Sequence, residues 1–285
     1  MRERKNTVLL FSKVPETGLV KTRLSILKDG IFLPEDAAHL YQCMLLDVVE
    51  IILAALDDLE AEQKQAGDSA AVRDVYDLVI STTPASNVEA MRTLLDGAAE
   101  WTRGFQVIAD EGADFDEHYN HAFTQCWEAG ADCILSMGAD MPALTKADVK
   151  FGFAQLHALD DRPEGGIVLA PDQEMGVSVV GWTRTTEFDH TGVFYNREGL
   201  TVLPAYIQKA AQHGLPVLWL PPIPDIDTMA DFVHNVTLVR ALEYCANFDD
   251  VRPAWRTIEA MADLGFSEIR VAPNDLRDPR DHIDV

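Results

Sequence analysis

The chain has 285 residues, of which 47% are hydrophobic and 25% charged, the balance of a soluble globular protein with one large domain or a domain and an appendage. Its net charge of −24 would be repelled by nucleic acid and by an anionic membrane, so we expect neither as a partner. A small anionic ligand, held in a local basic pocket or carried in with a metal ion, fits this charge better.

The start of the chain and its cysteines favour a cytoplasmic protein. The first residues are charged and lead directly into a strand pattern, unlike a signal peptide. No stretch approaches the roughly 20 uninterrupted apolar residues of a membrane span. The four cysteines form no CxxC pair, which argues against structural zinc, and we expect them to be buried, inert thiols.

Strand and helix patterns alternate along most of the chain. A strand at 8–11 is followed by a long helix that begins at 34 and gives way to an acidic, exposed loop at 57–68. The next segments, in order, are a strand at 77–82, a helix at 87–95, a strand at 105–109, a helix at 115–128, a strand at 133–137 and a helix at 146–159. Nearly continuously apolar strands between helices predict a mostly parallel sheet that is covered on both faces.

The second half departs from this alternation. Two strands at 166–170 and 177–182 follow each other closely, which predicts an antiparallel pair, and a helix at 201–213 precedes a last strand at 216–220. Beyond 233 the pattern is helical, at 233–242 and 255–264, and from 271 it is polar. We therefore predict one α/β domain over 1–240, with a helical extension and polar tail over 241–285 packed on it.

The stretch from Thr7 to Ser25 has the pattern of a phosphate-binding loop. Its strand runs into a turn with Pro15 and Gly18, and then into Lys21 and Arg23. The first 28 residues hold seven Lys/Arg and two acids, a balance of +5, whereas the other 257 residues sum to −29. Cations concentrated after a strand are a common phosphate cradle.

Carboxylates follow two of the later strands. Asp140 comes directly after the strand at 133–137, and Asp225 and Asp227 follow the strand at 216–220. Because parallel sheets bind ligands at the carboxyl ends of their strands, we expect these side chains to face the cationic loop. Mg²⁺ or Mn²⁺ prefers such oxygens together with phosphate, and would neutralise a leaving phosphate as Lys21 does from the other side.

Each of these residues also has a structural interpretation. Asp227 is placed to cap a helix, Asp140 to shape a turn, and Lys21 and Arg23 to form a solvated face. His118 and His121 lie three apart on a predicted helix, but no third metal ligand accompanies them. The chain has no GxSxG, GxGxxG or GxxxxGK[ST] motif. It therefore lacks the signatures of serine hydrolases, dinucleotide-binding folds and P-loop proteins, in that order.

The segment from Phe11 to Leu24, FSKVPETGLVKTRL, resembles the opening signature of the DUF2064 proteins, the rSAM/selenodomain-associated transferases. GADMPAL, from Gly138, is similar to that family's Gly-x-Asp-x-Pro-x-Leu segment, and DIDTMAD, from Asp225, resembles its Asp-x-Asp-Thr-x-x-Asp segment. A related opening occurs in 2-phospho-lactate guanylyltransferases. The resemblance implies a GT-A-like, nucleotide-diphospho-sugar transferase fold, a three-layer α/β/α sandwich, with Asp140 as a metal ligand.

One segment departs from the family pattern. Where the family carries Asp-Gly-Gly-Tyr-Tyr-Leu-Ile-Gly, this chain has EMGVSVVG from Glu174. Glu174 keeps a carboxylate, but Met175 replaces a glycine that would let the backbone approach a sugar or acceptor closely, and both aromatic residues are gone. We therefore predict an altered acceptor side around Glu174 and Gly176.

Our leading hypothesis is a GT-A-like transferase, dependent on Mg²⁺ or Mn²⁺, that moves a glycosyl group from a nucleotide-diphospho-sugar to a small acceptor. The alternatives are a guanylyl- or cytidylyl-type nucleotidyltransferase acting on an NTP, and a non-catalytic nucleotide-binding or scaffold protein. The oligomeric state stays open, with a homodimer among the alternatives. The predicted catalytic residues are Lys21, Arg23 and Asp140, the predicted metal ligands are Asp140, Asp225 and Asp227, and the predicted nucleotide contacts are Phe11, Ser12, Lys13, Pro15, Gly18, Lys21 and Arg23.

Overall fold

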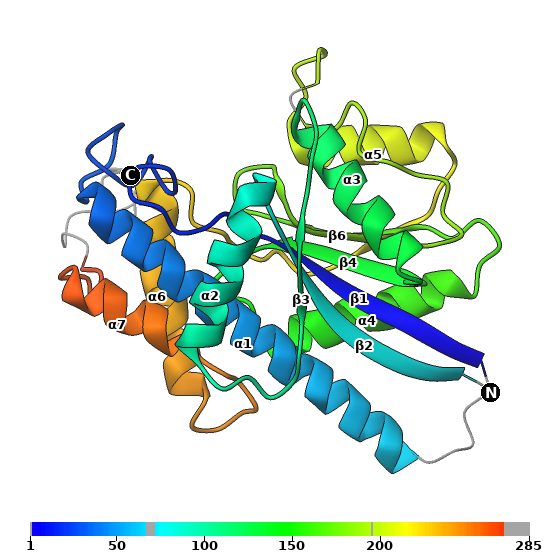
Figure 1. Cartoon of the computed structure of the whole chain (residues 1–285), viewed down its shortest axis with the longest axis horizontal. Coiled ribbons are helices and arrows are strands. Elements are labelled where there is room, and N and C mark those ends of the chain that lie inside the picture. The colour runs from blue at the N-terminus through cyan, green and yellow to red at the C-terminus, as the bar shows by residue number, and fades with distance from the viewer. Residues whose placement is uncertain (1, 67–71, 195, 271–285) are drawn as a thin grey trace, which may run out of the picture.

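The computed structural model describes residues 2–66, 72–194 and 196–270. These residues form one seven-stranded sheet in the order β3-β2-β1-β4-β6-β5-β7 (Figure 1). The strands are β1 (Arg2–Phe11), β2 (Val72–Thr82), β3 (Gln106–Ala109), β4 (Cys133–Gly138), β5 (Ile167–Pro171), β6 (Val177–Thr183) and β7 (Val217–Trp219). β6 runs antiparallel to both of its neighbours and the other pairs are parallel, so the predicted mixed, mostly parallel sheet is confirmed.

Helices cover both faces of this sheet. Side chains alternate along β1, so Val8 and Leu10 belong to the core under α1, whereas Leu9 belongs to the core under α3 and α5. The helices are α1 (Pro34–Ala66), α2 (Val88–Ala98), α3 (Phe115–Glu128), α4 (Lys146–Asp160), α5 (Val202–Gln212), α6 (Met229–Cys245) and α7 (Trp255–Asp263). With α1, α4 and α7 on one face and α3 and α5 on the other, the predicted three-layer α/β/α sandwich is confirmed (Figure 1).

The prediction of an exposed loop at 57–68 is wrong, because α1 continues to Ala66. The acidic residues there lie on the helix surface and are paired with cations from other elements. Lys146 Nζ lies 2.8 Å from Asp58 Oδ2, and Arg103 Nη2 lies 2.8 Å from Glu60 Oε1. The acids therefore mark the outer face of a helix whose inner face is buried.

α1 also corrects the expectation that no stretch approaches a membrane span. By length and composition alone, 34–65 is long and apolar enough to cross a membrane, and its most apolar window is 78% buried inside the protein. Its buried side chains pack on the sheet and on α4 and α7. In this fold α1 is the central core helix of its face.

The C-terminal helices are joined to the main core. The predicted boundary at residue 240 falls inside α6, and α7 packs on α1. Asp47 of α1 accepts hydrogen bonds from the backbone N and the hydroxyl of Thr257, at 2.7 and 2.8 Å, and one from Arg256 Nη1 at 3.0 Å. The predicted tail at 271–285 lies outside the described residues.

Three of the cysteines are buried, as predicted, and one is not. Burial raises the pKa of Cys43 to about 11 and that of Cys126 to about 12, and Cys133 is likewise buried. These thiols are therefore protonated and unreactive at neutral pH. Cys245, near the end of α6, is exposed, which corrects the expectation of four buried thiols.

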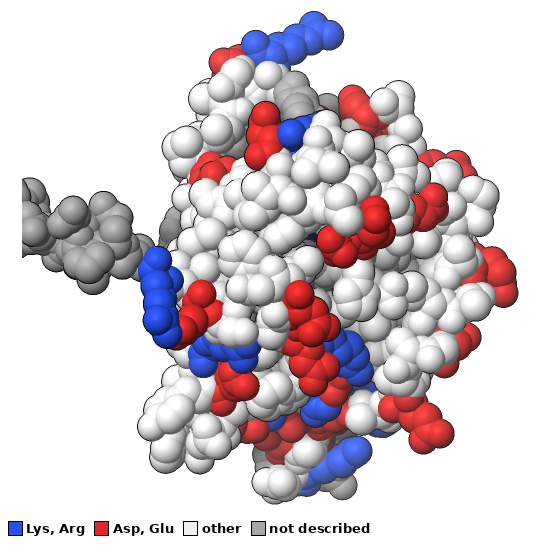
Figure 2. Space-filling view, turned by 90° about the vertical axis from the view of Figure 1, so that its left-hand side faces the viewer, with Lys and Arg blue, Asp and Glu red and all other residues white. Residues whose placement is uncertain are grey.

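The face shown in Figure 2 carries no broad basic area. Large uncharged areas separate small patches of acidic and basic side chains on it (Figure 2). An extended anionic partner would find no broad basic surface on this face.

Candidate active site

The carboxyl ends of β1 and β4 and the amino end of the antiparallel β6 open into a cavity of about 580 Å³, a volume in the usual range of small-ligand sites. The segment 12–33, between β1 and α1, forms one wall and is called the cationic loop below. It folds back on the molecule because Val20, Leu24 and Phe32 are buried in the core under α1. This packing carries Lys21 into the cavity.

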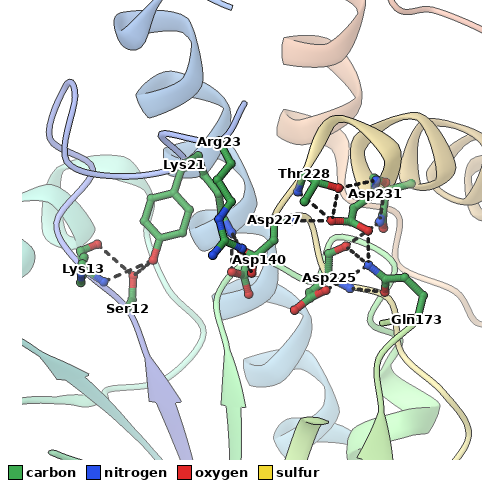
Figure 3. A network of polar contacts seen from close by, with 12 residues as sticks. Ser12, Lys13, Lys21, Arg23, Asp140, Gln173, Asp225, Asp227, Thr228 and Asp231 are labelled. Carbon is green, nitrogen blue, oxygen red and sulfur yellow. Dashed lines mark hydrogen bonds and ion pairs between the residues drawn. The ribbon is translucent and has the colours of Figure 1, made fainter. Parts of the chain in front are cut away.

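Lys21 is the centre of the site. Its backbone lies in the left-handed region with φ of 46°, which is unusual for a residue with a side chain. Its Nζ lies 2.6 Å from Asp140 Oδ2 and 2.9 Å from Asp227 Oδ1, and only 6% of its side chain is exposed (Figure 3). Three segments that are far apart in the sequence thus meet at one ammonium group.

The charges of this group are strongly coupled. Burial would lower the pKa of Lys21, but the charges of Asp140 and Asp227 outweigh it and raise that pKa well above its ordinary value. The charge of Lys21 in turn lowers the pKa of Asp227. Burial, together with the neighbouring charges of Asp140 and Asp227, raises the pKa of Asp225 to about 8. The site therefore holds more negative charge than Lys21 neutralises.

Hydrogen bonds from neighbouring side chains fix the loop that carries Asp225. Gln173 Nε2 donates to Asp225 Oδ1 at 3.1 Å and to Asp231 Oδ1 at 2.6 Å (Figure 3). Thr228 caps α6, since its hydroxyl accepts from Asp231 N and the Asp231 carboxylate accepts from Thr228 N at 2.7 Å. Asp227 is therefore not the helix cap that its position suggested, and it is free to pair with Lys21.

Another polar group lies at the β2–β3 end of the cavity. Ser81 Oγ donates to Asp110 Oδ2 at 2.7 Å, and His118 Nδ1 lies 2.6 Å from Asp110 Oδ1. On the cationic loop, Lys13 N donates to the hydroxyl of Tyr41 at 3.2 Å. Nothing in the sequence pattern of α1 distinguished Tyr41 from a core residue.

The structure brings most of the predicted site residues into one cavity. Pro15, Gly18, Arg23 and Glu174 are not among the residues that line it. Arg23 stands at its edge, with Nη1 3.8 Å from Asp227 Oδ2 and 61% of its side chain exposed. The predicted residues that do line the cavity are Phe11, Ser12, Lys13, Lys21, Asp140, Gly176, Asp225 and Asp227.

On the predicted acceptor side, the carboxylate that lines the cavity is Asp172, which the sequence analysis did not single out. Asp172 Oδ1 accepts hydrogen bonds from Glu174 N at 2.6 Å and from Gly176 N at 2.7 Å, so it shapes the turn between β5 and β6. A Cβ at Gly176 would lie 1.9 Å from Asp172 Oδ2, which explains the glycine. Met175 has φ of 67°, so it adopts the backbone conformation that the family's glycine would favour. The signal that the sequence offered for Asp172 was the position of this residue directly after β5.

The described residues contain no ready-made cluster of three or more acidic, His or Cys ligands for a metal. His118 and His121 bond separately, His118 to Asp110 and His121 Nδ1 to Glu111 N at 2.8 Å. The described cavity lining nevertheless holds five aspartates and only two lysines. These hard oxygens, and the burial and mutual repulsion that raise the pKa of Asp225, fit a divalent cation that uses one or two carboxylates and completes its shell with phosphate.

Comparisons with known proteins agree with this architecture. The model of the DUF2064 family, described as an uncharacterized protein conserved in bacteria, matches residues 66–197. The family resemblance is confirmed. The match includes Asp140 and the turn at 172–176 but neither the cationic loop nor Asp225. No curated protein matches the chain.

Solved structures show the same fold. A crystal structure from Desulfovibrio desulfuricans G20, described as a "putative nucleotide-diphospho-sugar transferase", has 23% identity and a TM-score of 0.67, covering 93% of this chain and 99% of its own. A cytidylyltransferase from Leptospira borgpetersenii serovar Hardjo-bovis has 13% identity and a TM-score of 0.49, covering 94% of this chain and 99% of its own. The first likeness shows that the chain has the nucleotide-diphospho-sugar transferase fold.

Proposed function

We propose that this protein is a transferase that takes a glycosyl group from a nucleotide-diphospho-sugar and gives it to a hydroxyl group of a small acceptor. The observation that carries the proposal is the convergence of the cationic loop, Asp140 and Asp227 on the buried ammonium of Lys21. The description given to the Desulfovibrio protein of the same fold supports it.

In this proposal the nucleotide occupies the cavity from the β2–β3 end to the centre. The base lies over Ser12 and Lys13, and the diphosphate lies near Lys21, whose fixed positive charge stabilises the leaving group. Mg²⁺ or Mn²⁺ would be held by Asp140 with Asp225 or Asp227, and a bound ion of this kind neutralises charge that develops on the leaving diphosphate. Arg23, at the edge of the cavity, would meet the phosphates only from outside.

The distribution of cations favours glycosyl transfer over nucleotidyl transfer. Among the described residues that line the cavity, the only Lys or Arg side chains are Lys13 and Lys21, both on the cationic loop. A nucleotidyltransferase must also hold a second substrate through its phosphate or carboxylate. At the other end of the cavity that group would face the carboxylate of Asp172, which repels it.

The backbone of the turn at Met175 supports an enzyme over the non-catalytic alternative. Met175 replaces a glycine of the family pattern, but it keeps the left-handed backbone that the turn requires. Gly176 still lines the cavity at the place where the backbone must pass closest to Asp172. The acceptor side is therefore changed in its side chains and kept in its backbone, which supports a different acceptor rather than a lost activity.

Two measurements test the proposed function. Thermal-shift assays with UDP, GDP, CDP and ADP, with and without Mn²⁺, are expected to show stabilisation by at least one nucleotide that increases with Mn²⁺. Incubation with the matching nucleotide sugars and a panel of hydroxyl acceptors should then release nucleoside diphosphate. Release of pyrophosphate from an NTP instead would establish the nucleotidyltransferase alternative, and no stabilisation by any nucleotide would contradict both enzymes.

We also propose a cytoplasmic location. The free, buried thiols of Cys43, Cys126 and Cys133 support it, since they suit a reducing compartment.

A further inference from the structure

One wall of the cavity is aromatic. Phe115 and Tyr119, at the start of α3, and Phe194, in the segment between β6 and α5, all line it. The ring centroids lie 5.0 Å apart for Phe115 and Tyr119, and 4.8 Å apart for each of these rings and Phe194. Tyr119 also stacks on Phe11, the last residue of β1, at 3.8 Å. These three side chains, Phe115, Tyr119 and Phe194, are called the aromatic wall below.

The aromatic wall is held in place from behind. Asp116 of α3 accepts hydrogen bonds from Gly192 N at 2.7 Å and from Phe194 N at 2.8 Å. Asn120, one turn further along α3, accepts from His190 N at 2.7 Å. A helix thus fixes the segment that carries Phe194, and the rings are preorganised as a binding surface should be.

The rings still have unused contact surface. Phe115 is 43% exposed, which is high for a large apolar side chain beside a cavity. The hydroxyl of Tyr119 makes no hydrogen bond among the described residues, although burial keeps its pKa above the ordinary value and the group therefore protonated. A ligand that stacks on the rings would cover the exposed surface of Phe115, and a polar atom of that ligand would pair with the Tyr119 hydroxyl.

The aromatic wall lies on the opposite side of the sheet from the cations. Residues of the cationic loop pack in the core under α1, whereas Tyr119 and Phe194 pack against the core under α3 and α5. Beyond the rings, the lining continues with Val177 at the start of β6 and Val202 at the start of α5. Its polar members at that end are Ser178 and the carboxylate of Asp172. This end of the cavity attracts apolar faces and hydroxyl groups and repels anions.

We infer that the aromatic wall is the acceptor subsite of the proposed transferase, and that it takes an uncharged, hydroxylated molecule with a flat aromatic or apolar face. The inference rests on the proposed function for the identity of the donor. The aromatic side chains that are missing from β6, where the chain has Val177 and Ser178, are thus supplied from the facing wall. Glycosyl transfer would join a hydroxyl oxygen of this molecule to the sugar carbon while the bond from that carbon to the diphosphate breaks, and the hydroxyl proton is released.

The base of the donor is a poorer occupant of this wall. The polar groups suited to a base, Ser81 and Asp110, lie at the β2–β3 end, whereas Phe194, Val177 and Val202 belong to the side of β6. A base on the aromatic wall would leave the phosphates beside Asp172 rather than beside Lys21. The charge distribution therefore assigns the two ends of the cavity to different substrates.

The test uses three probes of graded chemistry with the full-length protein in the presence of Mn²⁺. 4-Nitrophenyl β-D-glucoside is uncharged and has an aromatic face, methyl β-D-glucoside lacks that face, and glucose 1-phosphate is anionic. Calorimetric titration is expected to give affinity in that order. The double variant Phe115→Leu/Phe194→Leu should weaken binding of the aryl glucoside at least tenfold, while Phe248→Leu, an aromatic residue that is 77% exposed outside the cavity, should not change it.

The outcomes separate this inference from the proposed function. If glucose 1-phosphate binds best, or if the double variant binds the aryl glucoside as the wild type does, the acceptor subsite is refuted while nucleotide binding stands. If the double variant loses nucleotide-induced stabilisation as well, the wall holds the base and the inference is overturned. If the aryl glucoside binds through these rings but no nucleotide stabilises the protein, the subsite stands and the proposed donor falls.

Discussion

Two groups of partly buried charges lie at opposite ends of β1, and they are built differently. At its beginning, Arg4 binds Asp74 through two nitrogens, at 2.6 and 3.1 Å, and lies 3.4 Å from Asp160. Asn6 Nδ2 donates a further hydrogen bond to Asp74 Oδ1 at 2.9 Å, and His157 lies 2.9 Å from Asn6 Oδ1. Each charge in this group has directional partners, and none of its residues lines the cavity of the candidate site.

At the other end of β1, one ammonium group faces three carboxylates. Lys21 pairs with Asp140 and Asp227, while Asp225 is left with a pKa raised to about 8. The first group is locally balanced and serves stability. The second is acidic in excess and opens into a cavity, which is the arrangement expected of a site that awaits a cationic or metal-bound ligand.

The largest expected effect is on activity, at the unbalanced end. Lys21→Met removes the fixed positive charge beside the proposed diphosphate, and we expect release of nucleoside diphosphate to slow by about 10²–10³-fold. Lys28→Met is the matched control, because Lys28 lies exposed in the same loop and should leave the rate unchanged. A rate for Lys21→Met within tenfold of the wild type would remove Lys21 from the mechanism and break the comparison.

The next effect is on stability, at the balanced end. Arg4→Met leaves Asp74 and Asp160 without their cation, and we expect the free energy of unfolding to fall by about 3–5 kcal/mol in urea titrations. Arg2→Met is the control, since Arg2 also pairs with Asp160 but is 56% exposed, and it should cost less than about 0.5 kcal/mol. Folded Arg4→Met should bind nucleotide like the wild type, and a loss of binding there would contradict the separation of the two groups.

Acid should weaken the balanced group. Burial, with the charge of Arg4, lowers the pKa of His157 from 6.5 to about 4, so the folded protein binds its proton less readily than the unfolded chain. The stabilisation is complete above about pH 6.5 and is lost as the pH falls toward 4, by about 2 kcal/mol between pH 7 and pH 5. His157→Gln should flatten that part of the stability profile, whereas the exposed His234→Gln should not. Equal slopes for the two variants would show that His157 titrates normally.

These comparisons also show what the sequence could predict. The strand and helix order, the antiparallel pair and the two acidic segments follow from local patterns, because periodicity and strand ends are local properties. The count of seven cations in the first 28 residues pointed to the right loop, but only some of those cations belong to that loop. Arg2, Arg4 and Lys5 lie along β1 and pair with acids at the end away from the site. A charge count cannot separate cations that the fold places at opposite ends of one strand.

The missed residues have a common physical cause. Tyr41, Asp172 and the aromatic wall contribute to the site through packing between elements that are distant in sequence, and the place of Asp172 directly after β5 was the one local signal among them. The exposed loop predicted at 57–68 failed for the same reason, since its acids are neutralised by Lys146 and Arg103 from elsewhere in the chain. Residue type and spacing identified the half of the site that binds charge. The apolar half required the structure.

The smallest effect should have the opposite pH dependence and should come from the unbalanced end. Burial and neighbouring negative charge raise the pKa of Asp225 from 3.8 to about 8. The protonated Asp225 therefore contributes fully to the free energy of unfolding below about pH 4. This contribution is lost as the pH rises to about 8, because the unfolded chain gives up its proton first. In metal-free buffer at pH 8, Asp225→Asn should be more stable than the wild type, on the order of 1 kcal/mol because Lys21 and solvent offset part of the repulsion.

Asp29→Asn, at an exposed position of the cationic loop, is the control for that variant and should leave the unfolding free energy unchanged at both pH values. The stability difference between Asp225→Asn and the wild type should shrink toward pH 4, and Mn²⁺ should reverse its sign at pH 8 by stabilising the wild type more. Acid would then weaken one end of β1 while alkali weakens the other. If Asp225→Asn is instead less stable than the wild type at pH 8 without metal, the carboxylate is held as firmly as Asp74, and the excess of negative charge is not what distinguishes the site.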